Sequence, residues 1–329
     1  MAKILVTGGA GMIGSNLVKK LTGLGHNVLV IDNLWRGKLE YLNDFNTSTP
    51  CIDLSKNFHN LDLSENISDI TPFQGTEYIF HLADIVAGIG YVFSNQSSIF
   101  RQNILINTNT IDLARKLKVK GFIYAGTACS FPAELQNSFE YKLLKEDELY
   151  PANPESAYGW SKLMGIYEAD LLEKEFGIKV LSLIFHNIYG APCDFSDARS
   201  QVIPALIRKA VRFPDEEFVV WGSGKQGRAF LHIDDVVNAL LLGLKYGLGK
   251  GYIQIGPDYS TTIAELASRI VEISGKNIKV VFDTTKPEGD KARAADFRKA
   301  SEILGWKPEV DLKQGLEKTY KWIEQQMKV

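Results

Sequence analysis

A glycine-rich turn near the N-terminus constrains the fold of this chain most strongly. The apolar run KILVT is followed by Gly8, Gly11 and Gly14, which open an amphipathic run. A strand that turns sharply into a helix needs glycine where backbones approach closely. The order of a strand-like run and then a helix-like run recurs as far as about Gly190. Such alternation is typical of an α/β protein with a doubly wound parallel sheet.

The glycine turn and the strand after it predict a dinucleotide site. Backbone amides at Gly8 and Gly11, together with the start of the helix, can face a pyrophosphate. The next strand, NVLVID, ends in Asp32, whose carboxylate can accept hydrogen bonds from both ribose hydroxyls of the adenosine. That carboxylate would repel a 2′-phosphate, so the sequence favours NAD over NADP, although Arg36 could weaken the preference. We expect a Rossmann-type fold that binds NAD.

The regular alternation weakens after Gly190, and this change suggests two domains. Residues 1–190 are predicted to form the NAD-binding Rossmann domain. Residues 191–329 are predicted to form mainly a smaller substrate-binding domain, with some of their segments packing back on the first.

Composition excludes several classes of partner. The net charge is -2 and no long run of Lys and Arg occurs, which argues against binding to nucleic acid or to an anionic membrane surface. No apolar run approaches the roughly 20 residues that span a bilayer. The 3 cysteines are widely spaced and show no metal-ligand pattern. We expect a reduced, cytoplasmic protein without a metal.

The segment SAYGWSK carries candidate catalytic residues. Tyr158 and Lys162 lie four positions apart, so a helix would place them on one face, where the ammonium can lower the pKa of the phenol. A tyrosinate is a suitable general base for a sugar hydroxyl whose carbon gives a hydride to nicotinamide. Thr127 ends another apolar strand, at the edge of the sheet where ligands bind, and can orient the substrate oxygen.

The glycine turn, Asp32, Thr127, Tyr158 and Lys162 in this order resemble the extended short-chain dehydrogenases/reductases, the NAD-dependent epimerase/dehydratase family. The resemblance covers essentially the whole chain. Further segments, among them ADIVAGIGYVFSNQ, FHNIYG, WGSGKQGRAF and KPEG, resemble its GDP-mannose 3,5-epimerase branch and related enzymes of GDP-sugars. The resemblance implies a GDP-linked substrate, chemistry that begins by oxidising C4 of the sugar, and a homodimer or larger homo-oligomer.

The resemblance also implies roles for individual residues. Tyr158 would take the proton of the C4 hydroxyl, Lys162 would hold the phenolate and the nicotinamide ribose, and Thr127 would bind the developing carbonyl oxygen. The expected cofactor-binding residues, besides Tyr158 and Lys162, are Gly8, Gly11, Met12, Ile13, Asp32, Asp62, Leu63, Leu82 and Ala83. The expected substrate-binding residues, besides Thr127, are Gly88, Gly90, Cys129, Asn187, Gln201, Arg228 and Arg293, with both arginines on the diphosphate.

Several positions depart from the family pattern. The 3,5-epimerases use a thiol at the position of Cys129 as a base, but Gln201 stands near the place of their acidic lysine, and an amide does not deliver a proton. His186 is either a substitute acid or a packing residue. Ile184 stands where relatives usually have an arginine. Dehydratases place carboxylic side chains directly after the catalytic threonine, where Ala128 and Cys129 stand here.

These departures leave the step that all members share. We expect NAD-dependent oxidation at C4 of a GDP-linked manno-configured sugar, mannose or heptose, to the 4-keto sugar, within polysaccharide or capsule biosynthesis. A 3,5-epimerase that uses Cys129, or a 4-epimerase, is the alternative. A non-catalytic NAD-sensing regulator is a further alternative from another class.

Overall fold

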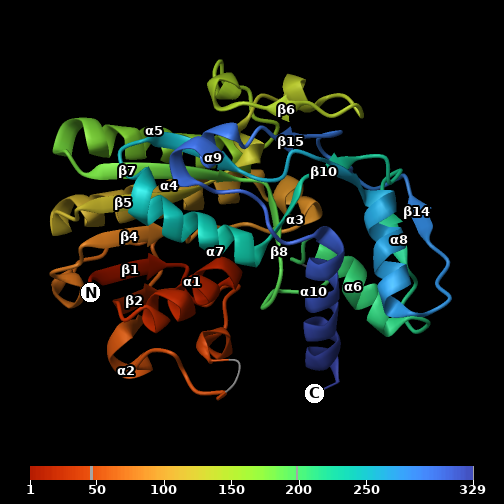
Figure 1. Cartoon of the computed structure of the whole chain (residues 1–329), viewed down its shortest axis with the longest axis horizontal. Coiled ribbons are helices and arrows are strands. Elements are labelled where there is room, and N and C mark those ends of the chain that lie inside the picture. Colours follow the sequence, from red (N-terminus) through yellow and green to blue (C-terminus); the bar gives the residue numbers. More distant parts are fainter. Residues whose placement is uncertain (45–46, 198, 329) are drawn as a thin grey trace.

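The computed structural model describes residues 1–44, 47–197 and 199–328. Its centre is a seven-stranded sheet in which all neighbouring strands are parallel (Figure 1). In spatial order the strands are β12 (Gly251–Ile255), β7 (Lys179–Phe185), β5 (Gly121–Thr127), β4 (Tyr78–His81), β1 (Lys3–Thr7), β2 (Asn27–Ile31) and β3 (Phe58–His59). The predicted doubly wound, Rossmann-type α/β fold is confirmed.

Helices cover both faces of this sheet, because its strands are apolar on both sides. Alternate strand residues such as Leu5 and Phe122 pack beneath α4 (Gln96–Leu117) and α5 (Ala157–Phe176). The intervening residues, such as Val6 and Ile123, pack beneath α1 (Met12–Gly23) and α7 (Ile233–Leu242). Burial of both strand faces explains why the strands read as nearly continuous apolar runs rather than alternating ones.

The register of the strands aligns their carboxyl ends. Thr7 of β1 lies opposite Ile31 of β2 and His81 of β4, and Thr127 of β5 lies opposite Phe185 of β7. The segments that follow these strands therefore meet at one edge of the sheet, where ligands of open α/β sheets bind.

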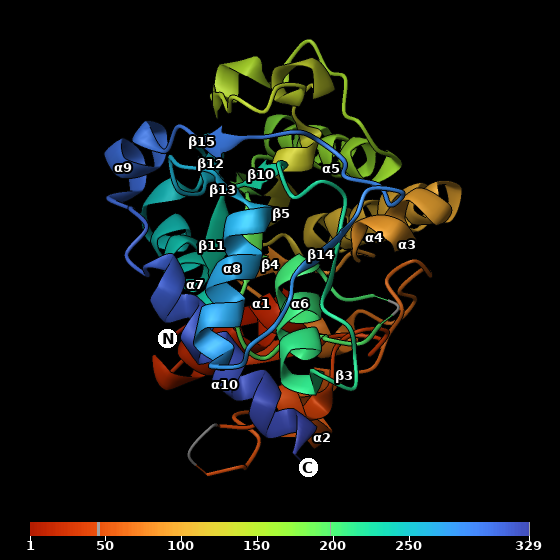
Figure 2. The ribbon, with the colours of Figure 1, turned by 90° about the vertical axis from the view of Figure 1, so that its right-hand side faces the viewer.

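The C-terminal part of the chain has a core of its own. Helices α6 (Val202–Arg212), α8 (Ile263–Ser274) and α10 (Leu312–Met327) enclose it, and Figure 2 shows them grouped in front of the sheet. Three pairs of short strands link this part to the rest of the chain or brace it: β8 (Asn187–Tyr189) with β11 (Phe230–His232), β9 (Val219–Trp221) with β14 (Val281–Asp283), and β10 (Gly227–Arg228) with β13 (Thr261–Thr262).

Some later segments pack on the first core. Strand β12 extends the central sheet beside β7, and Trp306, after α9 (Arg298–Leu304), lies in the core beneath α7. The remaining short elements are α2 (Leu54–Asn57), α3 (Ile89–Ser94), and β6 (Leu143–Leu144), which pairs with β15 (Ala294–Ala295). The boundary at residue 190 stays a prediction.

Among the helices of the described ranges, none has the length and apolar character needed to cross a membrane.

Candidate active site

A cavity of about 750 Å³ lies at the carboxyl edge of the sheet, between the sheet and the C-terminal part. The structure brings together in its lining every residue that the sequence suggests for the site. These are Gly8, Gly11, Met12, Ile13, Asp32, Asp62, Leu63, Leu82, Ala83, Gly88, Gly90, Thr127, Cys129, Tyr158, Lys162, Asn187, Gln201, Arg228 and Arg293. Their individual roles stay predictions.

The glycine turn is built for close approach. Gly8 has a positive φ of 67°, and a Cβ at Gly14 would lie 2.2 Å from the carbonyl oxygen of Gly8. Gly11 precedes α1 as its N-cap, and within the part of the chain that the structure describes no side chain caps the first amides of this helix. Amides that are uncapped by a side chain and face a cavity fit the pyrophosphate of NAD.

Asp32 is fixed where the cavity meets the end of β2. Its Oδ2 accepts a hydrogen bond from the amide of Ala10 at 2.9 Å, and its Oδ1 accepts one from the amide of Leu34 at 2.8 Å. Burial raises the pKa of this carboxyl, while the two amide bonds oppose the rise. The carboxylate thus joins the glycine turn to the strand end and fits the adenosine ribose.

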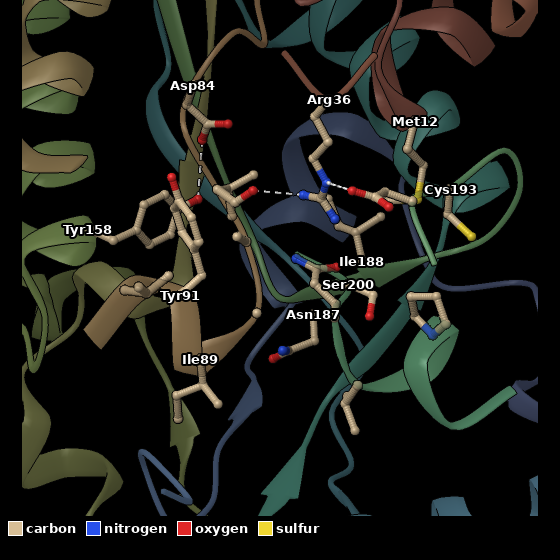
Figure 3. A pocket seen from close by; sticks show the side chains of 18 of the residues that line it. Met12, Arg36, Asp84, Ile89, Tyr91, Tyr158, Asn187, Ile188, Cys193 and Ser200 are labelled. Atoms are coloured by element: carbon tan, nitrogen blue, oxygen red, sulfur yellow. Dashed lines mark hydrogen bonds and ion pairs between the residues drawn. The ribbon is translucent and has the colours of Figure 1, made fainter. Parts of the chain in front are cut away.

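Arg36 has partners away from Asp32. Its Nη1 donates to the carbonyl oxygen of Val86 at 2.9 Å, and its Nε lies 3.7 Å from Oδ2 of Asp194 (Figure 3). These contacts tie the segment after β2 to the segments after β4 and β8. In this arrangement the guanidinium serves to hold three loops around the cavity.

The catalytic candidates come from two elements. Thr127 ends β5, while Tyr158 and Lys162 lie on α5, whose first turn is capped by Ser156 through a bond from the amide of Gly159 at 3.2 Å. A serine cap fixes where the helix begins, and so fixes which residues of its first turns face the strand ends. Helix α5 packs on β5 and on the 3-10 turn Ala128–Ser130 that follows it.

Asp84 stands between Tyr158 and Lys162. The phenol of Tyr158 donates to Oδ2 of Asp84 at 3.2 Å (Figure 3). Nζ of Lys162 lies 3.1 Å from the same oxygen. Burial raises the pKa of Tyr158 well above its ordinary value, and the charge of Asp84 raises it further. The expected lowering by Lys162 is therefore not seen in this arrangement, because the carboxylate engages the ammonium.

The thiol of Cys129 contacts an arginine rather than an acid. Nη2 of Arg293 donates to Sγ of Cys129 at 3.4 Å, while Nη1 donates to Oδ2 of Asp290 and to Oε1 of Gln136, both at 2.5 Å. Arg293 is 3% exposed, so its charge is held inside the protein by these partners. Arg293, which the sequence predicts to bind the diphosphate of the substrate, is thus already paired with the carboxyl group of Asp290.

A second carboxyl lies beside this group. Burial, followed by the neighbouring Asp290, raises the pKa of Glu155 to about 7, although Arg228 and Arg293 oppose the rise. Burial and the like charge of Arg293 lower the pKa of Arg228 to about 10. The wall of the cavity that holds Cys129 therefore combines two arginines, the carboxyl group of Asp290, and Glu155, a carboxyl that titrates near neutrality.

His186 is a neutral imidazole at neutral pH. Burial, and then the charge of Arg293, lower its pKa to about 3, and its Nε2 lies 3.2 Å from Oε1 of Gln254. The structure therefore argues against the substitute acid and for the packing residue. Ile184 lies within β7 and is fully buried in the core beneath α4 and α5.

Among the lining residues that sequence reasoning missed are three carboxyl groups that interact with the candidate site residues, namely Asp84, Glu155 and Asp290. A signal existed for Asp84, because the segment HLAD places a carboxylate directly after a buried strand. Glu155 and Asp290 gave no such signal, since they are far apart in the chain and meet only through tertiary packing.

Known proteins resemble this chain along its whole length. The model of the NAD dependent epimerase/dehydratase family matches residues 4–256, and the chain belongs to this family. GDP-mannose 3,5-epimerase of Arabidopsis thaliana is 34% identical over 327 residues, which cover 99% of this chain and 83% of that protein. A probable GDP-L-fucose synthase of Oryza sativa subsp. japonica is 30% identical over 327 residues, covering 97% and 91%.

A solved structure of a nucleotide-sugar epimerase also resembles this chain. The UDP-glucose 4-epimerase of Thermotoga maritima, solved with UDP-glucose, superposes with a TM-score of 0.85 at 28% identity and 99% coverage of both chains. The chain is thus an NAD-dependent enzyme of nucleotide-sugar chemistry, with GDP-sugar epimerases and synthases among its relatives. This result sets aside the NAD-sensing regulator.

Proposed function

We propose that the enzyme oxidises C4 of a GDP-linked manno-configured sugar, mannose or heptose, and yields the 4-keto sugar. The proposal rests on which side chains line the cavity. Thr127, Tyr158 and Lys162 line it together, while Gln201, an amide, lines it where the epimerase branch is expected to hold a lysine acid. The GDP-sugar names of the relatives support the choice of nucleotide.

In this proposal each residue has a limited task. NAD held at the glycine turn and Asp32 would supply the acceptor for the hydride of C4. Tyr158 takes the proton of the C4 hydroxyl, and the hydroxyl of Thr127 holds the oxygen in place as it becomes a carbonyl. Arg228 and Arg293 bind the diphosphate, to which planar guanidinium groups are well suited.

The test is the identity of the product. Purified enzyme is incubated with GDP-mannose and, separately, with GDP-heptose, the reaction is trapped with borodeuteride, and the sugar is analysed by NMR. The proposal predicts deuterium bonded to C4 in one of the two sugars, since only a 4-ketone accepts it there. Trapped sugar without label at C4, for both substrates, rejects the proposed reaction.

A second candidate is a 3,5-epimerase, and Glu155 favours it. A 4-ketone acidifies the protons at C3 and C5, so a base and an acid on the two faces of the sugar suffice for inversion. Cys129 can be the base, and Glu155, with its pKa of about 7, can deliver a proton at neutral pH. A 4-epimerase needs no such pair, only rotation of the 4-keto sugar in the cavity.

Replacement of Glu155 distinguishes a 3,5-epimerase from an enzyme that only oxidises C4. If the enzyme is a 3,5-epimerase, Glu155→Gln reduces inversion by about 10²-fold or more, the usual contribution of a general acid, and leaves C4 oxidation in place. Glu175→Gln, an exposed change near the end of α5, is the control. If Glu155→Gln and Glu175→Gln invert the sugar at the same rate, Glu155 is not the acid of the reaction.

We also propose a cytoplasmic homodimer that serves polysaccharide biosynthesis, such as capsule formation. The family resemblance supports pairing through α4 and α5. Both helices carry large exposed apolar side chains, namely Phe100, Leu105 and Tyr167.

A further inference from the structure

Asp84 is held firmly at the end of β4. The amides of Leu82 and Ala83 donate to Oγ1 of Thr7 at 3.2 and 3.3 Å, and the amide of Ile85 donates to Oδ1 of Asn103 at 2.7 Å. The backbone on both sides of Asp84 is therefore anchored to β1 and to α4. Its carboxylate is directed at α5, as Figure 3 shows.

This placement affects how Tyr158 can act. A tyrosine whose phenol is buried and donates its proton to a carboxylate rests in the neutral form. A neutral phenol accepts the proton of a sugar hydroxyl only if it releases its own proton at the same time. Among the described residues, the oxygen within hydrogen-bond distance that can receive it is Oδ2 of Asp84.

We propose that Asp84 is the proton acceptor behind Tyr158, so that the base of the enzyme is a two-residue relay rather than a preformed tyrosinate. This inference rests on the proposed oxidation at C4. The hydroxyl proton of C4 moves to the phenolic oxygen while the phenolic proton moves to Oδ2 of Asp84. The hydride leaves C4 as described above, so the carbonyl forms and charge is conserved.

The surroundings of Asp84 suit this task. Lys162 is buried, with a side chain 2% exposed, and its ammonium fixes the carboxylate by the 3.1 Å ion pair. The side chain of Asp84 is 12% exposed, so a proton that arrives there can pass to water in the cavity. The ionisable groups that face Tyr158 are Asp84 after β4, Tyr124 on β5, Cys129 in the turn after β5, and Lys162 on α5 through Asp84.

The pH dependence of Asp84→Asn tests the relay. The asparagine preserves shape and still accepts the phenolic hydrogen bond, but it cannot take the proton. We expect C4 oxidation to fall by about 10²–10⁴-fold at neutral pH, the size of a general-base contribution. We also expect partial recovery at alkaline pH, where Tyr158 itself ionises. Full activity of Asp84→Asn at neutral pH overturns the proposal.

A second measurement does not depend on turnover. The pKa of Tyr158 is read from tyrosinate absorbance, as the difference between each protein and the same protein with Tyr158→Phe. We expect the pKa of Tyr158 to be lower in Asp84→Asn, because the nearby negative charge is lost and Lys162 is released. An unchanged pKa overturns the proposal. Asp112→Asn, an exposed change on α4, is the control for both measurements.

The wild-type enzyme provides a test that needs no variant. In mixtures of light and heavy water, a step that moves two protons gives a curved dependence of the single-turnover oxidation rate on deuterium content, whereas one proton gives a straight line. We expect a curve, and a straight line refutes the relay. If wild type oxidises no GDP-sugar, the proposed function fails, while the titration of Tyr158 still shows whether Asp84 keeps the phenol in its neutral form.

Discussion

At the scale of single residues, the reaction outcome depends on which proton donors line the cavity. Gln201 precedes α6 as its N-cap and faces the cavity without a side-chain bond to the first amides of that helix. An amide at this place can hydrogen-bond sugar hydroxyls but supplies no proton. The thiol of Cys129 is therefore left without the acid partner that the epimerase branch implies.

A proton donor placed at position 201 should allow the hydrogens at C3 and C5 of the sugar to exchange with solvent. We expect Gln201→Lys to raise incorporation of solvent deuterium at C3 or C5 by about 10-fold or more, less than the 10²–10⁴-fold of an optimally placed acid. Gln201→Met, with a stem of similar length and no ammonium, is the matched control. No gain in Gln201→Lys, with C4 oxidation intact, would show that the glutamine is not what prevents epimerisation.

At the scale of elements, the site depends on how closely α5 lies on β5. Gly165 lies on α5 one turn after Lys162, and a Cβ there would be 2.1 Å from the hydroxyl of Tyr124 and 2.8 Å from Nδ2 of Asn107. Tyr124 and Asn107 are themselves buried and cannot easily yield. The glycine thus permits the approach that positions Tyr158 beside the strand ends.

Gly165→Ala should therefore damage both stability and activity. Overpacking of a buried site lowers the free energy of unfolding by about 1–3 kcal/mol, and the displaced helix carries Tyr158 and Lys162 with it. Gly23→Ala in the last turn of α1 is the control, because a Cβ there meets nothing within 4 Å. It should raise stability by up to about 1 kcal/mol. Equal denaturant midpoints for the two variants would contradict this account.

The sequence predicted the elements of the site where their positions follow from local order. Thr127 and Asp32 each end an apolar strand, and Tyr158 and Lys162 share one helix, so parallel-sheet geometry brings them to one edge. Contacts between Glu155, Asp290 and Arg293 could not be predicted, because they join segments that no local pattern relates. The protonation state of Tyr158 was also beyond prediction, since it depends on a third side chain.

At the scale of the whole molecule, exposed apolar side chains on two helices support the proposed assembly. Leu105 on α4 is 38% exposed and Tyr167 on α5 is 53% exposed, on helices that pack side by side. Exposed apolar side chains that lie together on one face are typical of a protein–protein interaction site. The proposed homodimer would cover the face of the molecule that these helices form.

Charge on this face should separate the subunits. We expect wild type to sediment as a dimer and Leu105→Glu/Tyr167→Glu to sediment as a monomer at the same concentration, because burying two carboxylates in an interface is strongly unfavourable. Tyr246→Glu, after α7 on the opposite side of the sheet, should leave the assembly unchanged. A monomeric wild type would exclude the dimer. A dimeric double variant would show that the subunits meet through another face.

The central claim is that oxidation at C4 occurs without inversion of the neighbouring carbons. The most direct measurement is turnover of GDP-mannose and GDP-heptose in heavy water, followed by mass spectrometry and NMR of the borohydride-trapped sugar. We expect NADH formation and a 4-keto product that retains hydrogen at C3 and C5 over the time of enzyme turnover. Deuterium at C3 or C5, formed at the rate of turnover, would contradict it and identify the enzyme as an epimerase.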